Sequence, residues 1–542
     1  MFRSLYEPLS HTANESGDQV AWIVPKNGSI RSIRWSELRL DVDRLACWLE
    51  SNGVKPQDRV VNTEPNSLGW AILDLACAAI GAIHAPIDPR WSELQKAQAI
   101  ESLEPRAVFG TELLTIATAL EQATSMPKSS QQLRWQEAVR TDQTANILWT
   151  SGTSARPKGV MLSHNNLLSN GLAKLDAMPQ TTSDIRLNLL PFAHGYARTC
   201  ELTAWLLSRS AMACVASYQS NSANTAPTRA LGNALGDALG ELAQIVRPTL
   251  INAVPSAFQH WLQLAQIPSP QAESSGPLKS FFGGHVRQFA SGGAPIAEAI
   301  RTRFADESLP IFQGYGLTEA SPVVCSNRAR CIRNGTVIPE ILEGVGPAVQ
   351  GVQVRIDHEG RLSVRGPGVM QGYWRDEQAT EARIVDGWLD TGDIVSMQIA
   401  PPGKSSGESS GGSSEQSSGQ TSDITKPIRI AGRADDVQVL SNGYKFAPLE
   451  LERKIEQIES IAQCVVVGGD RRAPLAILCL KPDASREKSE LLLQIHQILA
   501  HEPEHLRTVQ IALSPEEWTI QNGFRHWKGG VNRVEIARKF AH

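Results

Sequence analysis

Short apolar runs that alternate with helix-like stretches constrain the fold of this chain more than any other feature of its sequence. Asn146–Trp149, Thr249–Val254 and Val352–Ile356 are runs of the kind that form strands. From Ser36 to Glu50 the spacing is helical instead, with apolar residues at steps of four, three and four, and Gly53 follows as a stop signal. Strands and helices that alternate in this way pack as layers, so we predict an α/β fold.

The length of 542 residues allows several hydrophobic cores, and domain-size statistics suggest roughly two to four domains. The tail of the chain has strand-like runs of its own at Ile428–Ala431, Cys464–Val467 and Leu475–Leu480. We therefore predict a large N-terminal domain over residues 1–432, in which β-sheets pack with helices in several layers. A small α+β domain is expected over residues 433–542.

One helix of this tail is marked by its sequence. Pro448 suits the first turn of a helix, and Leu451, Ile455 and Ile458 then fall on one face. The preceding Ser441–Gly443 is typical of a turn.

The segment Lys404–Asp423 differs from the rest in composition. It consists almost entirely of Ser, Gly and acidic or amide residues, and it has no apolar side chain to bury. We predict a flexible, disordered insertion without a chemical role, lying within the N-terminal domain. The domain boundary is expected after it, near Gly432–Asp436.

The bulk properties exclude several classes of protein. A net charge of -4 with 20% charged residues gives no electrostatic reason to expect nucleic acid as a partner. Eight scattered cysteines without a C-x-x-C pair suggest neither a zinc site nor a disulfide framework. The first residues lack a secretory signal, and Leu68–Ile87 is expected to be a buried helix and strand rather than a membrane span. A cytoplasmic location fits best, whereas peripheral membrane contact and the oligomeric state remain open.

The stretch Thr150–Gly159, TSGTSARPKG, is the most informative for function. It follows the apolar run NILW directly. A strand that enters a loop of glycines and hydroxyl residues presents N–H and O–H groups to phosphate oxygens, and Lys158 adds a positive charge. The spacing is not that of a Walker P-loop. Taken alone, the same stretch could equally be a Ser/Gly surface loop.

Three further stretches carry polar groups in a suggestive order. In Gln313–Val323 a hydroxyl residue stands beside a carboxylate, Thr318 and Glu319, which suits Mg²⁺ held between protein and phosphates. Asp386–Asp393 is interpreted as a turn-rich loop whose final carboxylate accepts hydrogen bonds from ribose hydroxyls. Ala431–Asp436 then places an arginine and acids near the expected domain junction. Each alone is compatible with an ordinary turn.

In this order and spacing, the set resembles the adenylate-forming superfamily, and the resemblance covers nearly the whole chain. The branch it resembles most is that of the fatty acyl-CoA synthetases. Four segments carry that likeness: LPFAHGYARTCEL (190–202), RPTLINAVPSAF (247–258), FASGGAPI (289–296) and NGYKFAPLELE (442–452).

The resemblance implies a set of contacts to the ATP phosphates. These fall on Thr150, Ser151, Gly152, Thr153, Ser154 and Lys158. The family usually has a second threonine where this chain has Ser154, which keeps the hydroxyl, and glycine where it has Ala155. If that position requires a positive φ, alanine strains the loop and weakens ATP binding.

The resemblance also implies roles around the nucleotide base and the metal ion. Tyr315, next to Gly314, matches an aromatic residue that stacks near adenine. Thr318 and Glu319 match contacts to phosphate and Mg²⁺, with Glu319 as the metal ligand. His194 matches a histidine of the acyl and thiol region, although a buried structural histidine is an equal alternative.

In the last part of the chain the resemblance implies a ribose contact and a domain switch. Asp393 matches the ribose-binding aspartate and Arg433 an arginine that reaches the nucleotide. Asp435 falls at the hinge, so the small domain is expected to be mobile and to rotate after adenylation. That rotation would bring Gly443 and Lys445 to the coenzyme A channel.

The match weakens at a lysine that, in relatives, bridges the acid and the α-phosphate. Trp518–Gly523 and Arg533 fit the surrounding pattern, but Gly530 occupies the lysine position and Lys528 lies two residues earlier. Either Lys528 swings into the site, because Gly529 and Gly530 make the loop pliable, or no cation arrives and adenylation is slow.

We therefore predict an enzyme that activates a carboxylic acid with ATP and Mg²⁺ and transfers the acyl group to coenzyme A, an acid–thiol ligase. A medium- or long-chain fatty acid is the first expectation for the substrate. The alternatives are an aromatic or succinylbenzoate-type acid, delivery to a carrier protein, and a degenerate member of the fold that only binds.

Overall fold

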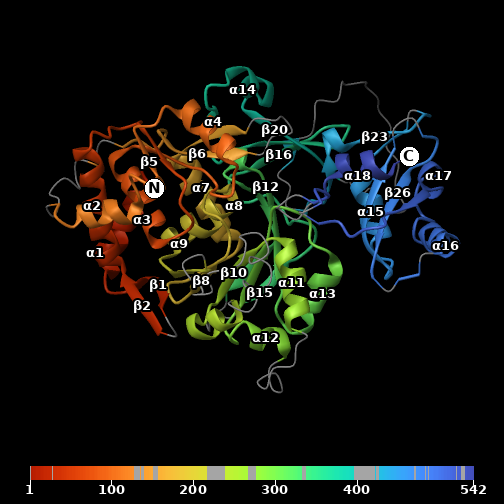
Figure 1. Cartoon of the computed structure of the whole chain (residues 1–542), viewed down its shortest axis with the longest axis horizontal. Coiled ribbons are helices and arrows are strands. Elements are labelled where there is room, and N and C mark those ends of the chain that lie inside the picture. Colours follow the sequence, from red (N-terminus) through yellow and green to blue (C-terminus); the bar gives the residue numbers. More distant parts are fainter. Residues whose placement is uncertain are drawn as a thin grey trace, which may run out of the picture. The chain divides into compact units, whose positions relative to one another are not determined.

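The computed structural model describes residues 2–26, 29–126, 135, 139–150, 157–215, 239–265, 276–331, 337–395, 421–422, 426–442, 444–468, 471–482, 484–485, 487–519, 522–525 and 531–541. They form two compact units (Figure 1). Unit 1 comprises the described residues of 1–353, 364–389 and 424–427, and unit 2 those of 354–363, 390–423 and 428–542. The predicted boundary between residues 432 and 433 remains a prediction.

The larger sheet of unit 1 has eight strands in the order β13-β12-β11-β10-β8-β9-β1-β2. The strands are β1 (Val20–Lys26), β2 (Ser29–Arg34), β8 (Ile185–Asn188), β9 (Ala211–Cys214), β10 (Leu250–Ala253), β11 (Gln288–Ser291), β12 (Ile311–Gly316) and β13 (Val323–Ser326). Pairing is parallel from β12 to β1, and antiparallel at both ends of the sheet. The central strands β8 to β11 are almost wholly buried, which explains their continuous apolar character.

A second sheet of unit 1 has six strands in the order β18-β7-β6-β4-β3-β5. The strands are β3 (Arg59–Asn62), β4 (Ile83–Pro86), β5 (Ala107–Phe109), β6 (Thr144–Thr150), β7 (Lys158–Ser163) and β18 (Gly372–Tyr373). β3 to β6 are parallel, whereas β7 runs antiparallel to both β6 and β18. This antiparallel edge carries the predicted phosphate loop.

Helices complete unit 1, together with two short antiparallel strands, β14 (Arg328–Cys331) and β15 (Val337–Ile341), and the strand β19 (Ile384–Val385). The helices are α1 (Tyr6–Ser16), α2 (Trp35–Ser51), α3 (Leu68–Ile80), α4 (Glu93–Leu103), α5 (Ile116–Ala123), α7 (His164–Ala177), α8 (Gly195–Ala197), α9 (Ala204–Ser208), α11 (Pro255–Ala265), α12 (Pro277–Phe281), α13 (Glu298–Asp306) and α14 (Glu377–Arg383), with a π-helical turn η1 (Arg198–Thr203) and a 3₁₀ turn η3 (Thr318–Ala320). In Figure 1, α1, α2 and α3 lie together in the red and orange part of the chain, and they pack against one another.

Two predictions about the N-terminal part are confirmed. The amphipathic helix is α2, and its apolar residues at the predicted steps are buried. Leu68–Ile87 is a buried helix and strand, α3 and β4, because α3 ends at Gly81, which adopts φ 72°. Within the described part of the chain, no helix has the length and apolar character needed to cross a membrane.

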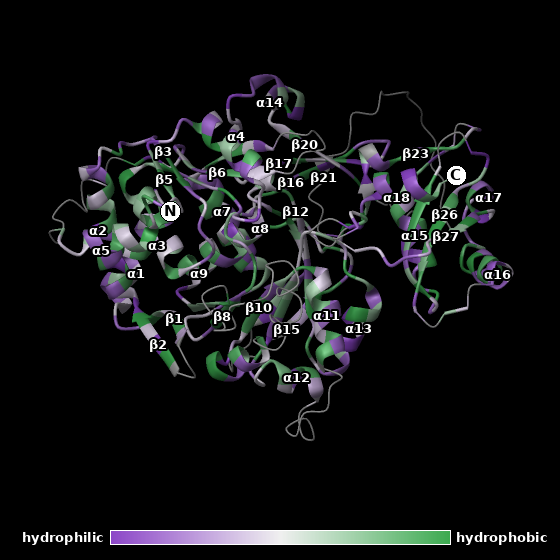
Figure 2. Cartoon of the chain, in the orientation of Figure 1, coloured by the Kyte–Doolittle hydropathy of each residue, from purple (hydrophilic) through white to green (hydrophobic). Residues whose placement is uncertain are grey.

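Unit 2 contains a three-stranded sheet with an apolar core on both faces. Its strands are β25 (Ile461–Val467), β26 (Leu475–Leu480) and β27 (Gln510–Leu513), and its helices are α15 (Pro448–Ile455), α16 (Lys488–Ile498), α17 (Glu504–Arg507) and α18 (Arg533–Phe540). Figure 2 shows the central strand β26 as hydrophobic along its length. The predicted strands at 464–467 and 475–480 are thus confirmed.

The remaining strands of unit 2 are short or belong to it only in part. They are β16 (Gln353–Ile356), β17 (Arg361–Arg365), β20 (Trp388–Val395), β21 (Thr421–Ser422), β22 (Ile430–Arg433), β23 (Gln438–Val439) and β24 (Lys445–Phe446), with a 3₁₀ turn η4 (Ala434–Asp436). The division between the units runs through β16, β17 and β20. β20 pairs with β22, β16 with β21, and β23 with β24, all antiparallel.

Several sequence-based boundaries need correction. The predicted strand at 428–431 begins two residues later, as β22. The helix opened by Pro448 ends at Ile455, so Ile458 lies in the following turn, where its N–H donates to Ile455 O. Thr421 and Ser422 form a strand although they fall in the predicted insertion, whose residues 404–420 lie outside the described part of the chain.

The stretch Asp386–Asp393 is not a loop. Asp386 and Gly387 adopt φ 52° and 76°, and Val385 pairs with Trp388, so the two residues form the turn of a β-hairpin. The residues that follow extend as β20, which places Asp393 inside a paired strand.

Candidate active site

The two ends of the predicted phosphate loop lie side by side. Thr150 pairs with Lys158 and Trp149 with Gly159, as the last pairs of the β6–β7 hairpin. A Cβ at Gly159 would lie 2.8 Å from the Ile147 side chain, so glycine allows this close pairing. The predicted contacts Ser151, Gly152, Thr153 and Ser154, with Ala155, lie outside the described residues. The hairpin nevertheless fixes where the loop starts and ends.

Lys158 is held at the start of β7 by two neighbours. Its Nζ lies 3.6 Å from Asp376 Oδ2 and 5.0 Å from the centroid of the Tyr373 ring. With 34% of its side chain exposed, the ammonium group remains accessible from solvent. The positive charge of Lys158 therefore lies at the β7 end of the predicted loop.

Glu319 is a buried carboxylate with a defined partner. It lies in η3, and its Oε1 accepts a hydrogen bond of 2.9 Å from the Tyr373 hydroxyl. Its backbone carbonyl accepts from Met370 N at 2.8 Å. Burial raises the pKa of the Tyr373 hydroxyl, and the adjacent Glu319 charge raises it further, so Tyr373 remains a neutral donor.

The residues before Glu319 approach other backbone segments closely. A Cβ at Gly316 would lie 1.7 Å from Pro322 O, so the turn from β12 into η3 needs glycine there. Tyr315, next to Gly314, pairs with Cys325 and is half-buried. Thr318 faces Gly195, whose added Cβ would lie 3.3 Å from Thr318 Oγ1.

His194 lies beside a buried carboxylate. Its Nε2 is 2.8 Å from Asp88 Oδ2, and Arg90 Nη2 donates to the same oxygen at 2.6 Å. Burial opposes ionisation of Asp88, but the hydrogen bonds from Arg90 and His194 outweigh it and lower the pKa of this carboxyl. The His194 side chain is 20% exposed, so it is neither fully buried nor free of structural contacts.

A buried network supports the strand that enters the phosphate loop. Asn146 on β6 donates to Asp74 Oδ1 and accepts from Arg198 Nε of the π-helical turn η1. Arg198 also donates to Asp74 Oδ2 at 2.8 Å. Burial of Asp74 is outweighed by the Arg198 charge and by a hydrogen bond from His84, which lower the pKa of Asp74 to about 2.

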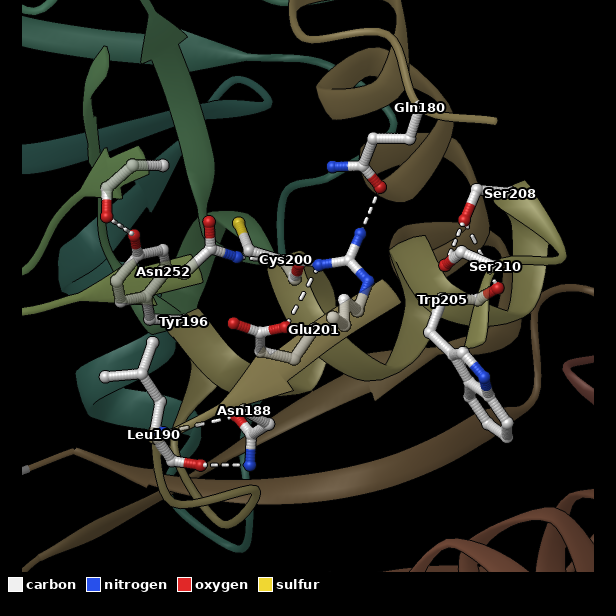
Figure 3. A network of polar contacts seen from close by, with 12 residues as sticks. Gln180, Asn188, Leu190, Tyr196, Cys200, Glu201, Trp205, Ser208, Ser210 and Asn252 are labelled. Carbon is white, nitrogen blue, oxygen red and sulfur yellow. Dashed lines mark hydrogen bonds and ion pairs between the residues drawn. The ribbon is translucent and has the colours of Figure 1, made fainter. Parts of the chain in front are cut away.

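A second buried network extends from the same turn (Figure 3). Arg186 donates to Glu201 Oε2 at 3.0 Å, to the Cys200 carbonyl at 2.9 Å and to Gln180. Asn252 Nδ2 on β10 donates to the same Cys200 carbonyl at 3.1 Å. These contacts fix η1 against the larger sheet, and no local sequence pattern pointed to them.

In unit 2, Asp393 and Arg433 form a pair across two strands. Asp393 on β20 is the register partner of Arg433 on β22, and Arg433 Nη1 donates to Asp393 Oδ1 at 3.3 Å. Thr391 Oγ1 accepts from Asp393 N at 3.1 Å and donates to Leu362 O at 2.7 Å. Asp393 is 6% exposed, so its carboxylate is held within the sheet.

The other predicted residues of this unit are placed only in part. Asp435 lies in η4, and its side chain is not described. Lys445 is exposed on β24, with Nζ 3.6 Å from Glu359 Oε1. Gly443 and Lys528, with Gly529 and Gly530, lie outside the described residues.

The segment that contains Lys528 has fixed ends. Arg525 pairs with Val531, and Asn532 N donates to Phe524 O at 2.8 Å, so the backbone is paired immediately before residue 526 and immediately after residue 530. Arg533, which follows, donates to both carboxylate oxygens of Glu452. The arginine of the expected pattern is therefore a structural anchor between α18 and α15.

The acidic side chains of the candidate site could hold a magnesium ion only together with the phosphates of a nucleotide. Within the described residues no group of three or more His, Cys, Asp or Glu side chains could hold a metal. Glu319 offers one carboxylate, and only its Oε1 has a hydrogen-bond partner among the described residues. Because Mg²⁺ is often bound through one or two carboxylates plus substrate phosphates, a single acidic ligand fits this ion.

Comparisons with known proteins agree with these motifs. A family model described as AMP-binding enzyme matches residues 9–374, and a model of the AMP-binding enzyme C-terminal domain matches residues 435–541.

Two relatives illustrate the similarity in sequence. A long-chain-fatty-acid–CoA ligase of Mycobacterium bovis is 26% identical over 525 residues, covering 84% of this chain and 79% of the relative. A feruloyl-CoA synthase of Amycolatopsis is also 26% identical, over 457 residues, covering 81% of this chain and 80% of the relative.

Solved structures share the fold. ATP-bound MatB from Rhodopseudomonas palustris is 22% identical with a TM-score of 0.71, and the match covers 99% of both chains. An o-succinylbenzoate CoA synthetase from Bacillus subtilis, in complex with its acyl-adenylate intermediate, is 17% identical with a TM-score of 0.66, and covers 93% of this chain and 94% of that one. Since one family model alone spans more than half of the sequence, the chain belongs to the AMP-binding enzyme family, within the adenylate-forming superfamily that its motifs indicated.

Proposed function

We propose that this enzyme activates a carboxylic acid with ATP, releases pyrophosphate, and transfers the acyl group from the acyl-adenylate to coenzyme A. The observation that carries the proposal is the grouping in unit 1, where Lys158 and Glu319 both contact Tyr373 beside the end of the predicted phosphate loop. A cation and a carboxylate held this close suit a triphosphate with its metal ion.

The first step of the proposed chemistry gives a task to each of two residues, Lys158 and Glu319. A carboxylate oxygen of the acid attacks the α-phosphorus, and pyrophosphate leaves. Lys158 offsets charge on the phosphates, and Glu319 holds Mg²⁺, which supplies further positive charge when it is bound with ATP. The coenzyme A thiol then attacks the acyl carbon, the C–O bond to AMP breaks, and the thiol proton goes to solvent or a base.

Asp393 and Arg433 are proposed as further contacts to the nucleotide. A carboxylate on a paired strand presents two acceptor oxygens suited to a ribose diol. The Arg433 contact fixes the orientation of that carboxylate before the nucleotide arrives. Lys528 is proposed as the cation that bridges the acid and the α-phosphate, and a domain rotation near Asp435 as the switch to thiol transfer.

A medium- or long-chain fatty acid is the proposed substrate, supported by the branch resemblance and by the ligase from M. bovis. An aromatic acid is the second candidate, because a feruloyl-CoA synthase has the same identity to this chain.

The test is ATP-dependent release of pyrophosphate with a panel of fatty, aromatic and dicarboxylic acids, each with and without coenzyme A. Turnover that rises with coenzyme A for one class of acid is the expected result. A rate of pyrophosphate release that does not change when coenzyme A is added would favour a carrier-protein acceptor. The absence of pyrophosphate release with every acid would favour a non-catalytic protein.

A further inference from the structure

Tyr373 links two groups that the sequence motifs placed far apart. Its hydroxyl donates to Glu319 Oε1 at 2.9 Å, while its ring receives Lys158 Nζ at 5.0 Å from the centroid. The residue is 6% exposed, and no phosphate, carboxylate or hinge motif of the sequence includes it.

The backbone around Tyr373 is held by hydrogen bonds of its own. As part of β18 it pairs with Val160 on β7, and Trp374 N donates to Gly159 O at 2.7 Å. Tyr373 N donates to Thr380 Oγ1 at 2.9 Å. The tyrosine is therefore fixed to the same hairpin strand that begins with Lys158.

We propose that Tyr373 is a positioning residue of the adenylation site, which orients the Glu319 carboxylate for Mg²⁺ and seats Lys158 beside the phosphate loop. The inference rests on the function proposed above. The hydrogen bond from the Tyr373 hydroxyl to Oε1 restrains rotation of the Glu319 carboxylate, which would hold Oε2 in a fixed orientation for a cation. The ring face gives the ammonium group of Lys158 a second contact besides Asp376.

The test uses two substitutions of Tyr373, which distinguish the role of its hydroxyl from that of its ring. Tyr373→Phe removes the hydroxyl and keeps the ring under Lys158, whereas Tyr373→Leu removes both. ATP binding is measured by calorimetry at a series of Mg²⁺ concentrations, alongside the Mg²⁺ dependence of pyrophosphate release. Partners that orient a metal ligand commonly change metal affinity about 10- to 100-fold, so Tyr373→Phe is expected to raise the half-saturating Mg²⁺ concentration about tenfold. Tyr373→Leu is expected to weaken ATP binding in addition.

Tyr6→Phe is the matched control. Tyr6 is also buried and donates to a carboxylate, Asp43 Oδ1 at 2.6 Å, but it belongs to helix α1, and its hydrogen bond and ring contact among the described residues involve no proposed site residue. Its variant should keep the Mg²⁺ dependence of the unsubstituted enzyme. Melting curves establish that each variant folds before it is titrated.

A second comparison tests whether Tyr373 acts through Glu319. The double variant Tyr373→Phe/Glu319→Gln should require no more Mg²⁺ than Glu319→Gln alone, because the hydroxyl then has no carboxylate to orient. Additive effects would overturn the inference, as would an unchanged Mg²⁺ curve for Tyr373→Phe or an equal shift in Tyr6→Phe. If the unsubstituted enzyme releases no pyrophosphate with any acid, the proposed function fails instead, and calorimetry still reports on Mg²⁺ and ATP binding.

Discussion

Asp393 and Arg433 face each other across the β20–β22 pair, with 3.3 Å between Asp393 Oδ1 and Arg433 Nη1. The two residues lie 40 positions apart in the chain, and the antiparallel pairing of β20 with β22 brings them together. We proposed both as nucleotide contacts, and the pair can be tested directly.

Asp393→Asn should raise the KM for ATP. Loss of a charge-assisted hydrogen bond costs about 2 kcal/mol, or roughly thirtyfold in affinity. Asp390→Asn on the same strand is the control, because Asp390 also pairs with an arginine, Arg361, at 3.0 Å, but on a more exposed part of the strand. Equal KM values for the two variants would contradict a ribose role for Asp393.

Glu319→Ala should abolish Mg²⁺-dependent release of pyrophosphate. The substitution removes the one acidic group that we assign to the metal ion, and it leaves the Tyr373 hydroxyl without its acceptor. Pyrophosphate release is followed over a range of Mg²⁺ concentrations. Undiminished release at every concentration would refute the assignment of the metal site.

Lys528→Ala tests the cation near the C-terminus. Removal of a group that stabilises charge in the transition state commonly costs on the order of a hundredfold to a thousandfold in rate. We expect that loss in adenylation, and little change in thiol transfer when the acyl-adenylate is supplied. Arg533→Lys is not a suitable control, because Arg533 anchors Glu452. Lys454→Ala, which removes the ion pair of Lys454 with Glu502, serves instead. Full adenylation by Lys528→Ala would show that another residue supplies the charge.

Deletion of residues 404–420 should leave turnover largely intact, since the composition of this segment offers nothing to bury. Deletion of 404–423 also removes β21, which pairs with β16, and should lower the melting temperature. Loss of turnover or folding after the shorter deletion would show that the insertion is not passive.

His164 should make folding stability fall in mild acid. Burial lowers its pKa to about 4, and its Nδ1 accepts from Leu5 N. Because the unfolded chain takes up a proton near pH 6.5 and the folded chain only near pH 4, stability decreases as pH falls through that window, by up to about 3 kcal/mol. His164→Asn keeps an acceptor for Leu5 N without titrating, so its unfolding curves should change less between pH 6.5 and 4. An identical pH dependence in both proteins would contradict this account.

Local sequence patterns predicted the fold well wherever one periodicity dominated. The steps within Ser36–Glu50 predicted α2 because one apolar face of that helix is buried. The continuous apolar run Leu475–Leu480 predicted β26 because this strand is buried on both faces. Asp386–Asp393 was predicted wrongly, since only its Asp-Gly pair turns and the rest is recruited into a sheet by partners distant in sequence.

Lys158 and Glu319 could be proposed from the sequence, because a cation and a carboxylate each have a chemistry of their own. The contact of Tyr373 with Glu319 was not predicted, because the two residues lie 54 positions apart in the chain and a tyrosine after glycine carries no local signal. The acid-binding residues are not marked by any motif either, because pocket shape depends on packing among many distant side chains.

The pairing of Thr150 with Lys158 has a consequence for how this family can diversify. Because β6 and β7 are paired up to these two residues, the strands set the distance that any segment joining Thr150 to Lys158 must span. An exchange of residues 151–156 for the corresponding segment of a relative would therefore be made between two positions that the strands hold together.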